Sequence, residues 1–235
     1  MSIIVQDLVK RYGKQHAVDH VTFEVGSGEI VGFIGPNGAG KSTVMKIICG
    51  YLSATSGSVS VNGFDVERQS MEVKRNIGYL PEHNPLYPEM FVKEYLTFVA
   101  GMYQLGSVTK RRISEIVEAT GLGYEQHKKI GVLSKGYRQR IGLAQALIHD
   151  PAVLILDEPT TGLDPNQIIE IRMLISELGK SKTVLLSTHI MQEVEAICQR
   201  ALIINRGVVV ANAAVDDLVK QYNKSLEDVF HELTQ

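Results

Sequence analysis

Apolar side chains recur at every second position in three short segments near the start of the chain, residues 3–5, 21–25 and 59–61. This period is typical of strands that bury one face. The third segment is followed by Asn62-Gly63, a dipeptide that favours the tight turn of a β-hairpin. The beginning of the chain therefore predicts a set of antiparallel strands.

Four further segments are apolar almost throughout, residues 30–34, 153–156, 184–187 and 202–204. Such runs are typical of strands that are buried on both faces. A helical pattern with one apolar face follows the second run, over residues 171–178. Apolar strands separated by amphipathic helices predict a parallel sheet with helices on both faces. Within the first 80 residues, only the segment 30–34 has this parallel character.

The middle of the chain, about residues 88–149, has the spacing of helices and contains no convincing strand. Apolar residues share a helical face at Val92, Tyr95, Leu96 and Val99, and again at Ile113, Ile116, Val117 and Thr120. Ser134 is placed to cap a third helix that runs to about His149. We therefore predict a helical insert at 88–149 within a single domain of residues 1–235. A short C-terminal extension at 206–235 is expected to hold a small strand and one or two short helices.

Composition narrows the class of protein. Hydrophobic residues are 44% and charged residues 21% of the 235 residues, as in an ordinary globular protein and unlike a disordered one. The net charge of −2 argues against nucleic-acid binding through bulk charge, and no nucleic-acid partner is expected. No apolar run approaches the roughly 18 residues that cross a bilayer, and the start of the chain lacks a signal-peptide layout. The two cysteines, Cys49 and Cys198, fit a reducing compartment, so we expect a cytoplasmic protein that reaches a membrane only through a partner.

The segment after 30–34 has the G-x-x-x-x-G-K-[ST] pattern of a phosphate-binding loop. The loop reads Gly35-Pro36-Asn37-Gly38-Ala39-Gly40-Lys41-Ser42-Thr43, and the helix predicted after it carries Val44, Ile47, Ile48 and Tyr51 on one face. Glycines let backbone N–H groups surround a polyphosphate, and the helix N-terminus adds a positive field. Lys41 would reach the outer phosphates, and the Ser42 hydroxyl would bind Mg²⁺, which prefers hard oxygen ligands. A glycine-rich turn that binds nothing is the plain alternative.

Two acidic residues, Asp157 and Glu158, end the apolar run at 153–156. Acids in such a place lower stability unless a positive group faces them. Asp157 would hold Mg²⁺ through water and Glu158 would face the attacking water, whereas two solvated acids are the alternative. A free Glu has a pKa of about 4.3, so Glu158 would mainly orient the water. His189 is placed to contact the γ-phosphate, although a histidine at a strand end more often makes a structural hydrogen bond.

The segment Leu133-Ser134-Lys135-Gly136-Tyr137-Arg138-Gln139 resembles the LSGGQ signature of the ATP-binding cassette (ABC) ATPases. Its physics is that of a second anion site, with a serine cap, a glycine that permits close approach of the backbone, and a helix dipole. Taken alone, the segment also fits an ordinary capped helix. Other matches follow in family order, with Tyr12 at the A-loop, 160–164 at the D-loop and 187–189 at the H-loop. The resemblance covers essentially the whole chain.

The resemblance implies an α/β fold, a RecA-like P-loop NTPase with a parallel sheet core, an N-terminal antiparallel β-subdomain and a helical insert. It also implies an ATPase whose cofactors are ATP and Mg²⁺. The residues implied to contact ATP, besides the phosphate loop, are Tyr12, Val18, Ser134, Lys135 and Gly136. The implied catalytic residues are Glu158, His189, Glu82 and Asp164, and the implied Mg²⁺ ligands are Ser42, Glu82 and Asp157.

Two positions depart from the family pattern. Lys135 stands in the signature where the commonest form has glycine, and Glu82 stands at the Gln-loop position. A carboxylate at position 82 still offers an oxygen to Mg²⁺ but adds a negative charge beside the γ-phosphate. Lys135 would partly offset the charge of the nucleotide that it faces.

A narrower resemblance is to the ABC-2 type exporters, and especially to the ATP-binding subunit of the gliding-motility-associated transporter. It is carried by residues 80–87, 190–196 and 225–230. It implies export through separate integral membrane subunits, a head-to-tail homodimer that forms with ATP, and a peripheral position at the inner face of the cell membrane. The expected coupling surface lies between 82–90 and the helix at 91–99, where an apolar cluster contains Leu86, Tyr87, Met90 and Phe91; packing of the helical insert explains that cluster equally well.

Two other functions stay open at this point. A soluble ABC-type ATPase not coupled to transport would act on DNA or ribosomes, but such proteins usually carry a long coiled-coil insertion or a second cassette, and the chain has neither. A non-catalytic nucleotide-binding module would fit the atypical Glu82 and Lys135. The presence of all four expected residues argues against it: Lys41, Asp157, Glu158 and His189. A GTPase would need a base-reading motif such as N-K-x-D, which is absent.

Overall fold

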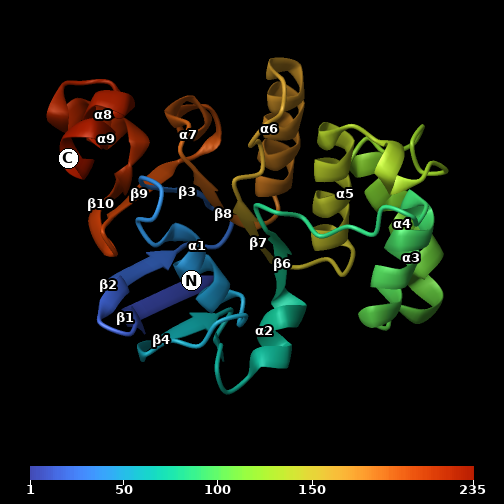
Figure 1. The fold of residues 1–235 in the computed structure, drawn as a ribbon, viewed down its shortest axis with the longest axis horizontal. Helices are drawn as coiled ribbons and strands as arrows, with labels where there is room; N and C mark the ends of the chain where they lie inside the picture. Colours follow the sequence, from blue (N-terminus) through green and yellow to red (C-terminus); the bar gives the residue numbers. More distant parts are fainter.

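The computed structural model describes all residues from Met1 to Gln235, arranged as two sheets with helices around them (Figure 1). The strands are β1 (Ile3–Tyr12), β2 (Gln15–Val25), β3 (Ile30–Ile34), β4 (Ser56–Val61), β5 (Phe64–Asp65), β6 (Ile77–Leu80), β7 (Val153–Asp157), β8 (Thr183–Thr188), β9 (Arg200–Asn205) and β10 (Val208–Ala214). The helices are α1 (Lys41–Ile48), α2 (Ser70–Asn76), α3 (Val92–Met102), α4 (Thr109–Ala119), α5 (Lys135–Leu147), α6 (Pro165–Gly179), α7 (Met191–Ile197), α8 (Val215–Tyr222) and α9 (Leu226–Thr234). Two short 3₁₀ turns lie at Gly106–Val108 and Ile130–Val132.

The smaller sheet is antiparallel and has the order β2-β1-β4-β5. Asn62 and Gly63, with φ of 49° and 83°, join β4 to β5 in the left-handed conformation that a tight hairpin turn requires. The predicted hairpin is confirmed, although β5 has only two residues. This sheet forms the N-terminal β-subdomain.

The larger sheet has the order β10-β9-β3-β8-β7-β6, in which all neighbours are parallel except the edge strand β10. The prediction of one parallel strand within the first 80 residues was wrong, because β6 also belongs to this sheet. Gly78 interrupts the apolar run of β6, and it is needed there because a Cβ would lie 2.2 Å from the backbone oxygen of Ala146. Helix α2, before β6, was also not predicted.

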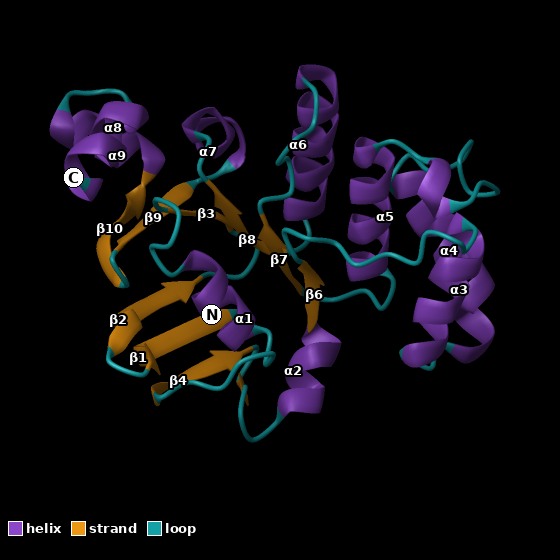
Figure 2. Cartoon of the chain, in the orientation of Figure 1, coloured by secondary structure: helices purple, strands orange, loops and turns teal.

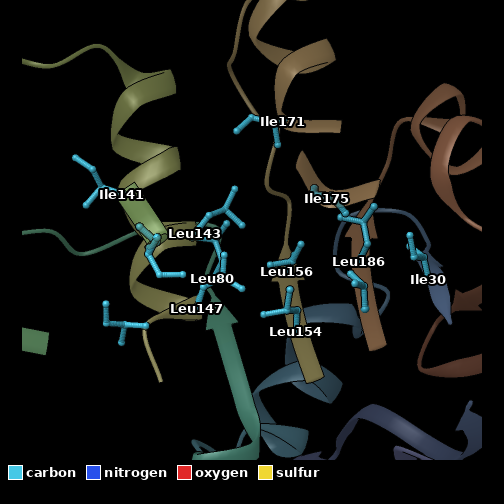
Figure 3. Close-up of a cluster of buried hydrophobic side chains, with 14 of the residues drawn as sticks. Ile30, Leu80, Ile141, Leu143, Leu147, Leu154, Leu156, Ile171, Ile175 and Leu186 are labelled. Atoms are coloured by element: carbon cyan, nitrogen blue, oxygen red, sulfur yellow. The ribbon is translucent and has the colours of Figure 1, made fainter. Parts of the chain in front are cut away.

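One face of the parallel sheet packs on helices and the other packs on the β-subdomain. Leu154 and Leu156 of β7 point toward the side of α5 and α6 in Figure 3, where they join a core of 33 buried residues. Val153 and Ile155, the alternate residues of β7, belong to a second core of 25 residues shared with α1 and the antiparallel sheet. The continuous apolar runs thus arise because both faces of each strand are covered.

Helices α3, α4 and α5 gather beside the edge strand β6, at the opposite end of the molecule from α8 and α9 (Figure 2). They lie within the residues 88–149 predicted as an insert, and no named strand interrupts them. Two helix ends differ from the prediction: α1 ends at Ile48, so Tyr51 lies beyond it and is 69% exposed, and α4 ends at Ala119, so Thr120 is its cap. No helix has both the length and the apolar character needed to cross a bilayer.

Candidate nucleotide site

The phosphate loop connects the end of β3 to the start of α1, and its backbone is open to a ligand. Gly40 has a φ of +111°, and a Cβ there would lie 2.5 Å from the carbonyl oxygen of Ala17. Gly38 has a φ of +80° with free space around it. Only glycine satisfies both conditions without strain, so the loop can turn its N–H groups toward an anion.

Lys41 is the charged residue at the centre of this loop. Its Nζ donates to the carbonyl oxygen of Gly35 at 2.6 Å and to that of Pro36 at 3.3 Å. Burial lowers the pKa of Lys41, while the carboxylates of Glu158, Asp157 and Glu82 oppose that shift. The ammonium therefore sits in a largely desolvated place where a phosphate would be a stronger partner than the carbonyl oxygens.

A cavity of about 470 Å³ opens over the loop. It is lined by Ala17, Asn37, Gly38, Gly40, Lys41, Ser42, Thr43, Glu82, Glu158, Thr161 and His189. Nine of these residues were predicted for the site. Ala17 and Thr161 were not; Thr161 lies within the D-loop-like segment, but nothing in the sequence marks Ala17. Ala17 is the one hydrophobic residue among them, and Lys41, Glu82 and Glu158 bring charge to the cavity, which fits a charged ligand.

The carboxyl ends of β7 and β8 bring the acidic pair to this cavity. Asp157 is 2% exposed and accepts a hydrogen bond from the Ser187 hydroxyl, which also accepts one from the Glu158 N–H at 3.1 Å. Glu158 has a φ of 52°, so the chain leaves the strand direction at this residue. Its Oε2 lies 2.8 Å from Nδ1 of His189 and accepts from the Thr161 hydroxyl at 3.1 Å.

The surroundings of Glu158 make it a better base than a free glutamate. Burial raises the pKa of Glu158, and His189, the Thr161 hydroxyl and Lys41 oppose the shift. A carboxyl whose pKa moves toward neutrality accepts a proton more readily. Because His189 is bonded to Glu158, it also has the structural hydrogen bond considered as its alternative role.

The signature-like residues lie away from this cavity, at the start of α5. The Ser134 hydroxyl accepts from the Tyr137 N–H at 3.4 Å and caps the helix, as predicted. Gly136 packs on the side chain of Gln167, which lies 2.6 Å from the place of a Cβ. Lys135 lies over Gly162 and lines an adjoining hollow of about 400 Å³, which shares Glu82 and Thr161 with the cavity.

Seven other predicted residues do not line the cavity either. Three of them belong to the phosphate loop itself: Gly35, Pro36 and Ala39. Asp164 is exposed and caps α6, where its side chain accepts from the Gln167 N–H at 3.0 Å. Tyr12 ends β1, is 52% exposed and lies under the Nζ of Lys10. Val18 is fully buried in β2, and Asp157 lies just beneath the cavity lining.

A phosphate loop between the parallel strand β3 and helix α1, with an acid pair at the end of β7 on the far side of β8, is typical of a P-loop NTPase. The chain belongs to the ABC transporter family, whose profile matches residues 18–161. It is 39% identical over 231 residues to the bacitracin transport ATP-binding protein BcrA of Bacillus licheniformis, a match that covers 97% of this chain and 75% of that protein. It is 38% identical to the linearmycin resistance ATP-binding protein LnrL of Bacillus subtilis, over 91% of this chain and 69% of that one.

Solved structures agree with this assignment. An ATP-binding subunit of an ABC transporter superposes with a TM-score of 0.90 at 33% identity, over the full length of both chains. A bacterial ABC transporter cassette solved as a dimer superposes with a TM-score of 0.82 at 25% identity, over 90% of this chain and 98% of that one. The fold predicted from the sequence is therefore confirmed, and the chain is the ATP-binding ATPase cassette of an ABC transporter.

Proposed function

We propose that this cassette drives an ABC exporter as an ATP-dependent, head-to-tail homodimer. The observation that carries the proposal is the separation of two anion sites within one chain. The phosphate loop lines the cavity at Lys41, whereas Ser134 and Gly136 of the signature-like segment do not line it. A nucleotide that uses both sites must lie between two copies, and the similar cassette solved as a dimer supports this arrangement.

Magnesium would enter with the nucleotide. No cluster of three or more His, Cys, Asp or Glu side chains is arranged to hold a metal ion. Mg²⁺ is usually bound by one or two carboxylates together with phosphate oxygens and water, so a small donor set fits it. Ser42 and Glu82 line the cavity and Asp157 lies beneath it, and these three residues would supply the hard oxygens. The ion would neutralise charge on the phosphates.

The chain's own residues then have distinct tasks. Lys41 would leave the carbonyl oxygens of Gly35 and Pro36 and bind the outer phosphates. Glu158 would orient the attacking water and take up its proton, helped by the burial that raises its pKa. His189, held by Glu158 at 2.8 Å, would present its other ring nitrogen to the γ-phosphate. Cleavage adds charge between the two copies and separates them.

Force would pass to membrane subunits through the segment before α3. Leu86 and Met90 pack partly on the core, so the packing explanation accounts for them. Tyr87 and Phe91 are 56% and 45% exposed, and Tyr87 meets the ring of Phe98 edge-on at 5.9 Å. This exposed aromatic group is our proposed coupling surface, and it would place the cassette at the inner face of the membrane.

Export is supported by the relatives' names, which concern bacitracin transport and linearmycin resistance. A role in gliding motility rests only on the resemblance of 80–87, 190–196 and 225–230, and neither of those two names mentions it. Both transport roles predict crosslinking between a cysteine at position 87 and a membrane subunit. A well-expressed complex with the membrane subunit that gives no crosslink from position 87 would count against this coupling surface.

Phosphate release by the purified chain tests the catalytic part of the proposal. We expect Mg²⁺-dependent hydrolysis of ATP that Lys41→Ala abolishes, and ATP-dependent dimers of Glu158→Gln in sizing experiments. A monomeric Glu158→Gln variant in saturating Mg-ATP would contradict the homodimer.

A further inference from the structure

The buried carboxylate of Glu193 connects the two segments that carry Glu158 and His189. Glu193 lies on α7, is 1% exposed, and accepts a hydrogen bond from the hydroxyl of Thr160 on one oxygen. Its other oxygen accepts from the hydroxyl of Thr188 at 2.7 Å. Thr160 is two residues after Glu158, and Thr188 directly precedes His189. Each proposed catalytic side chain is therefore close in sequence to a hydroxyl that binds the same carboxylate.

The surroundings of Glu193 indicate that this buried carboxylate lowers the stability of the fold. Thr160 and Thr188 are 2% and 0% exposed, so the whole group is shielded from water. The nearest cation is Arg172, whose Nη2 is 3.7 Å from Glu193, while its buried Nε has no partner. A buried acid with one distant cation lowers stability relative to an apolar residue of the same size.

The connection closes a ring through the site. Glu158 and His189 contact each other at 2.8 Å, and their neighbours Thr160 and Thr188 are joined through Glu193. Helix α7 packs against both β8 and α6 (Figure 1), so Glu193 is fixed by the surrounding elements. A displacement of about 1 Å in a catalytic group can slow a reaction about a hundredfold, so such a ring has consequences for rate.

We propose that Glu193 is a positioning residue for ATP hydrolysis, which holds the segment after Glu158 and the segment before His189 at a fixed separation through Thr160 and Thr188. The proposal rests on the catalytic roles proposed above for Glu158 and His189. Glu193 is not among the residues that line the nucleotide cavity, so the proposed route of its effect is the pair of hydrogen bonds to these two threonines.

Threonine variants test the proposal, because valine removes the hydroxyl at nearly constant volume and serine keeps it. Thr160→Val and Thr188→Val are expected to lower kcat by about tenfold or more with KM for ATP changed less than about threefold. Thr160→Ser and Thr188→Ser should keep kcat within about twofold of the unaltered chain, since the hydrogen bond to Glu193 can still form. Glu193→Gln has the same size and should lower kcat in the same way, because the amide nitrogen cannot accept a hydrogen bond from a threonine hydroxyl.

Thr183→Val is the matched control. Thr183 lies at the other end of β8, is 2% exposed, and bonds Ser2, Gly26 and Gly28, far from the cavity. The Thr183→Val variant should have a lower melting temperature but an unchanged kcat. If both valine variants and Glu193→Gln keep kcat within about twofold of the unaltered chain, or if the serine variants are as slow as the valine variants, the proposal is wrong. Failure of the catalytic assignment looks different, because Glu158→Gln would then hydrolyse ATP at the normal rate.

Discussion

Glu158 and His189 meet at 2.8 Å although 31 residues separate them, because they follow the neighbouring parallel strands β7 and β8. The register pairs Asp157 with Ser187, so both strands end at the same edge of the sheet. The positive φ of Glu158 then turns its carboxylate out of the strand direction. The contact therefore follows from the strand register and the turn at Glu158, which together bring the base and the histidine to one edge of the sheet.

Glu158→Gln should lower kcat by roughly 10²–10⁴-fold, the range that a positioned general base contributes. ATP affinity should change little, because the amide keeps the size of the carboxyl and the phosphate loop is untouched. Steady-state phosphate release and a binding titration measure the two quantities. Glu177→Gln, an exposed change on α6, is the control and should hydrolyse ATP normally. A Glu158→Gln variant with more than half of the normal kcat would exclude this residue as the base.

The same substitution should stabilise the empty protein at neutral pH. Burial raises the pKa of Glu158, so the folded carboxyl binds a proton more readily than the unfolded one. Its contribution to stability is present below its usual pKa of 4.5 and is lost as the pH rises through the raised value. Ionised Glu158 therefore opposes folding at pH 7, and glutamine does not ionise.

The expected result for Glu158→Gln at pH 7 is a higher Tm than that of the unaltered chain; in a domain of this size each kcal/mol corresponds to roughly 2–4 °C. Thermal unfolding without nucleotide at several pH values checks it, and the gain should shrink toward pH 4.5. An equal gain at every pH would assign the effect to packing instead of ionisation.

The sequence predicts those positions of the site at which only one type of residue can fill the role. Gly40 is required by a positive φ and a close carbonyl oxygen, so it appears as part of a recognisable loop. Ala17 lines the same cavity only because β2 passes over the loop, and an alanine there carries no chemical signal. Glu193 reads as one more polar residue of an amphipathic helix, and its burial depends on contacts between strands that are far apart in the sequence.

The fold, too, has elements that the sequence predicts and one strand that it does not. The runs at 153–156 and 184–187 predict buried strands because both of their faces are covered. Strand β6 has only four residues and contains Gly78, whose place is fixed by the backbone of Ala146. Such tertiary contacts leave no periodic pattern in the sequence, so this strand could not be predicted from it.

Glu82→Gln should weaken the binding of Mg²⁺ at the site, because it removes a carboxylate near the phosphates. Glu82 lines the cavity with Ser42, and its charge would attract Mg²⁺ while repelling the γ-phosphate. We expect the Mg²⁺ concentration for half-maximal hydrolysis to rise about three- to tenfold, equal to about 1 kcal/mol, whereas the affinity for metal-free ATP should increase. Magnesium titrations of phosphate release and binding titrations in chelator measure both. His83→Gln, at the next position, is the control, and unchanged magnesium dependence in Glu82→Gln would place that carboxylate outside the metal site.

Acid should destabilise the folded chain through His149. This residue stacks on Tyr103 with ring centroids 3.9 Å apart, and its Nε2 donates to the carbonyl oxygen of Ile77 at 2.9 Å. Its Nδ1 is buried without a hydrogen-bond partner, and burial lowers the pKa of His149 from 6.5 to about 4. The unfolded histidine therefore binds a proton more readily, so the stability present above pH 6.5 is lost as the pH falls toward about 4.

The loss from this one group is at most about 3 kcal/mol over that interval. Urea unfolding at pH 7, 6 and 5 should show a shallower decline for His149→Gln than for the unaltered chain, because glutamine does not titrate. His127→Gln, an exposed position, should keep the original decline. His149 lies just after α5 and joins it to β6 through the hydrogen bond to Ile77. Protonation of His149 would therefore also loosen the helical insert from the parallel sheet. Amide hydrogen exchange in α3 and α5 should then rise at pH 5, before the whole chain unfolds. If exchange in these helices follows that of β3 at every pH, the insert does not open separately and the acid effect is global.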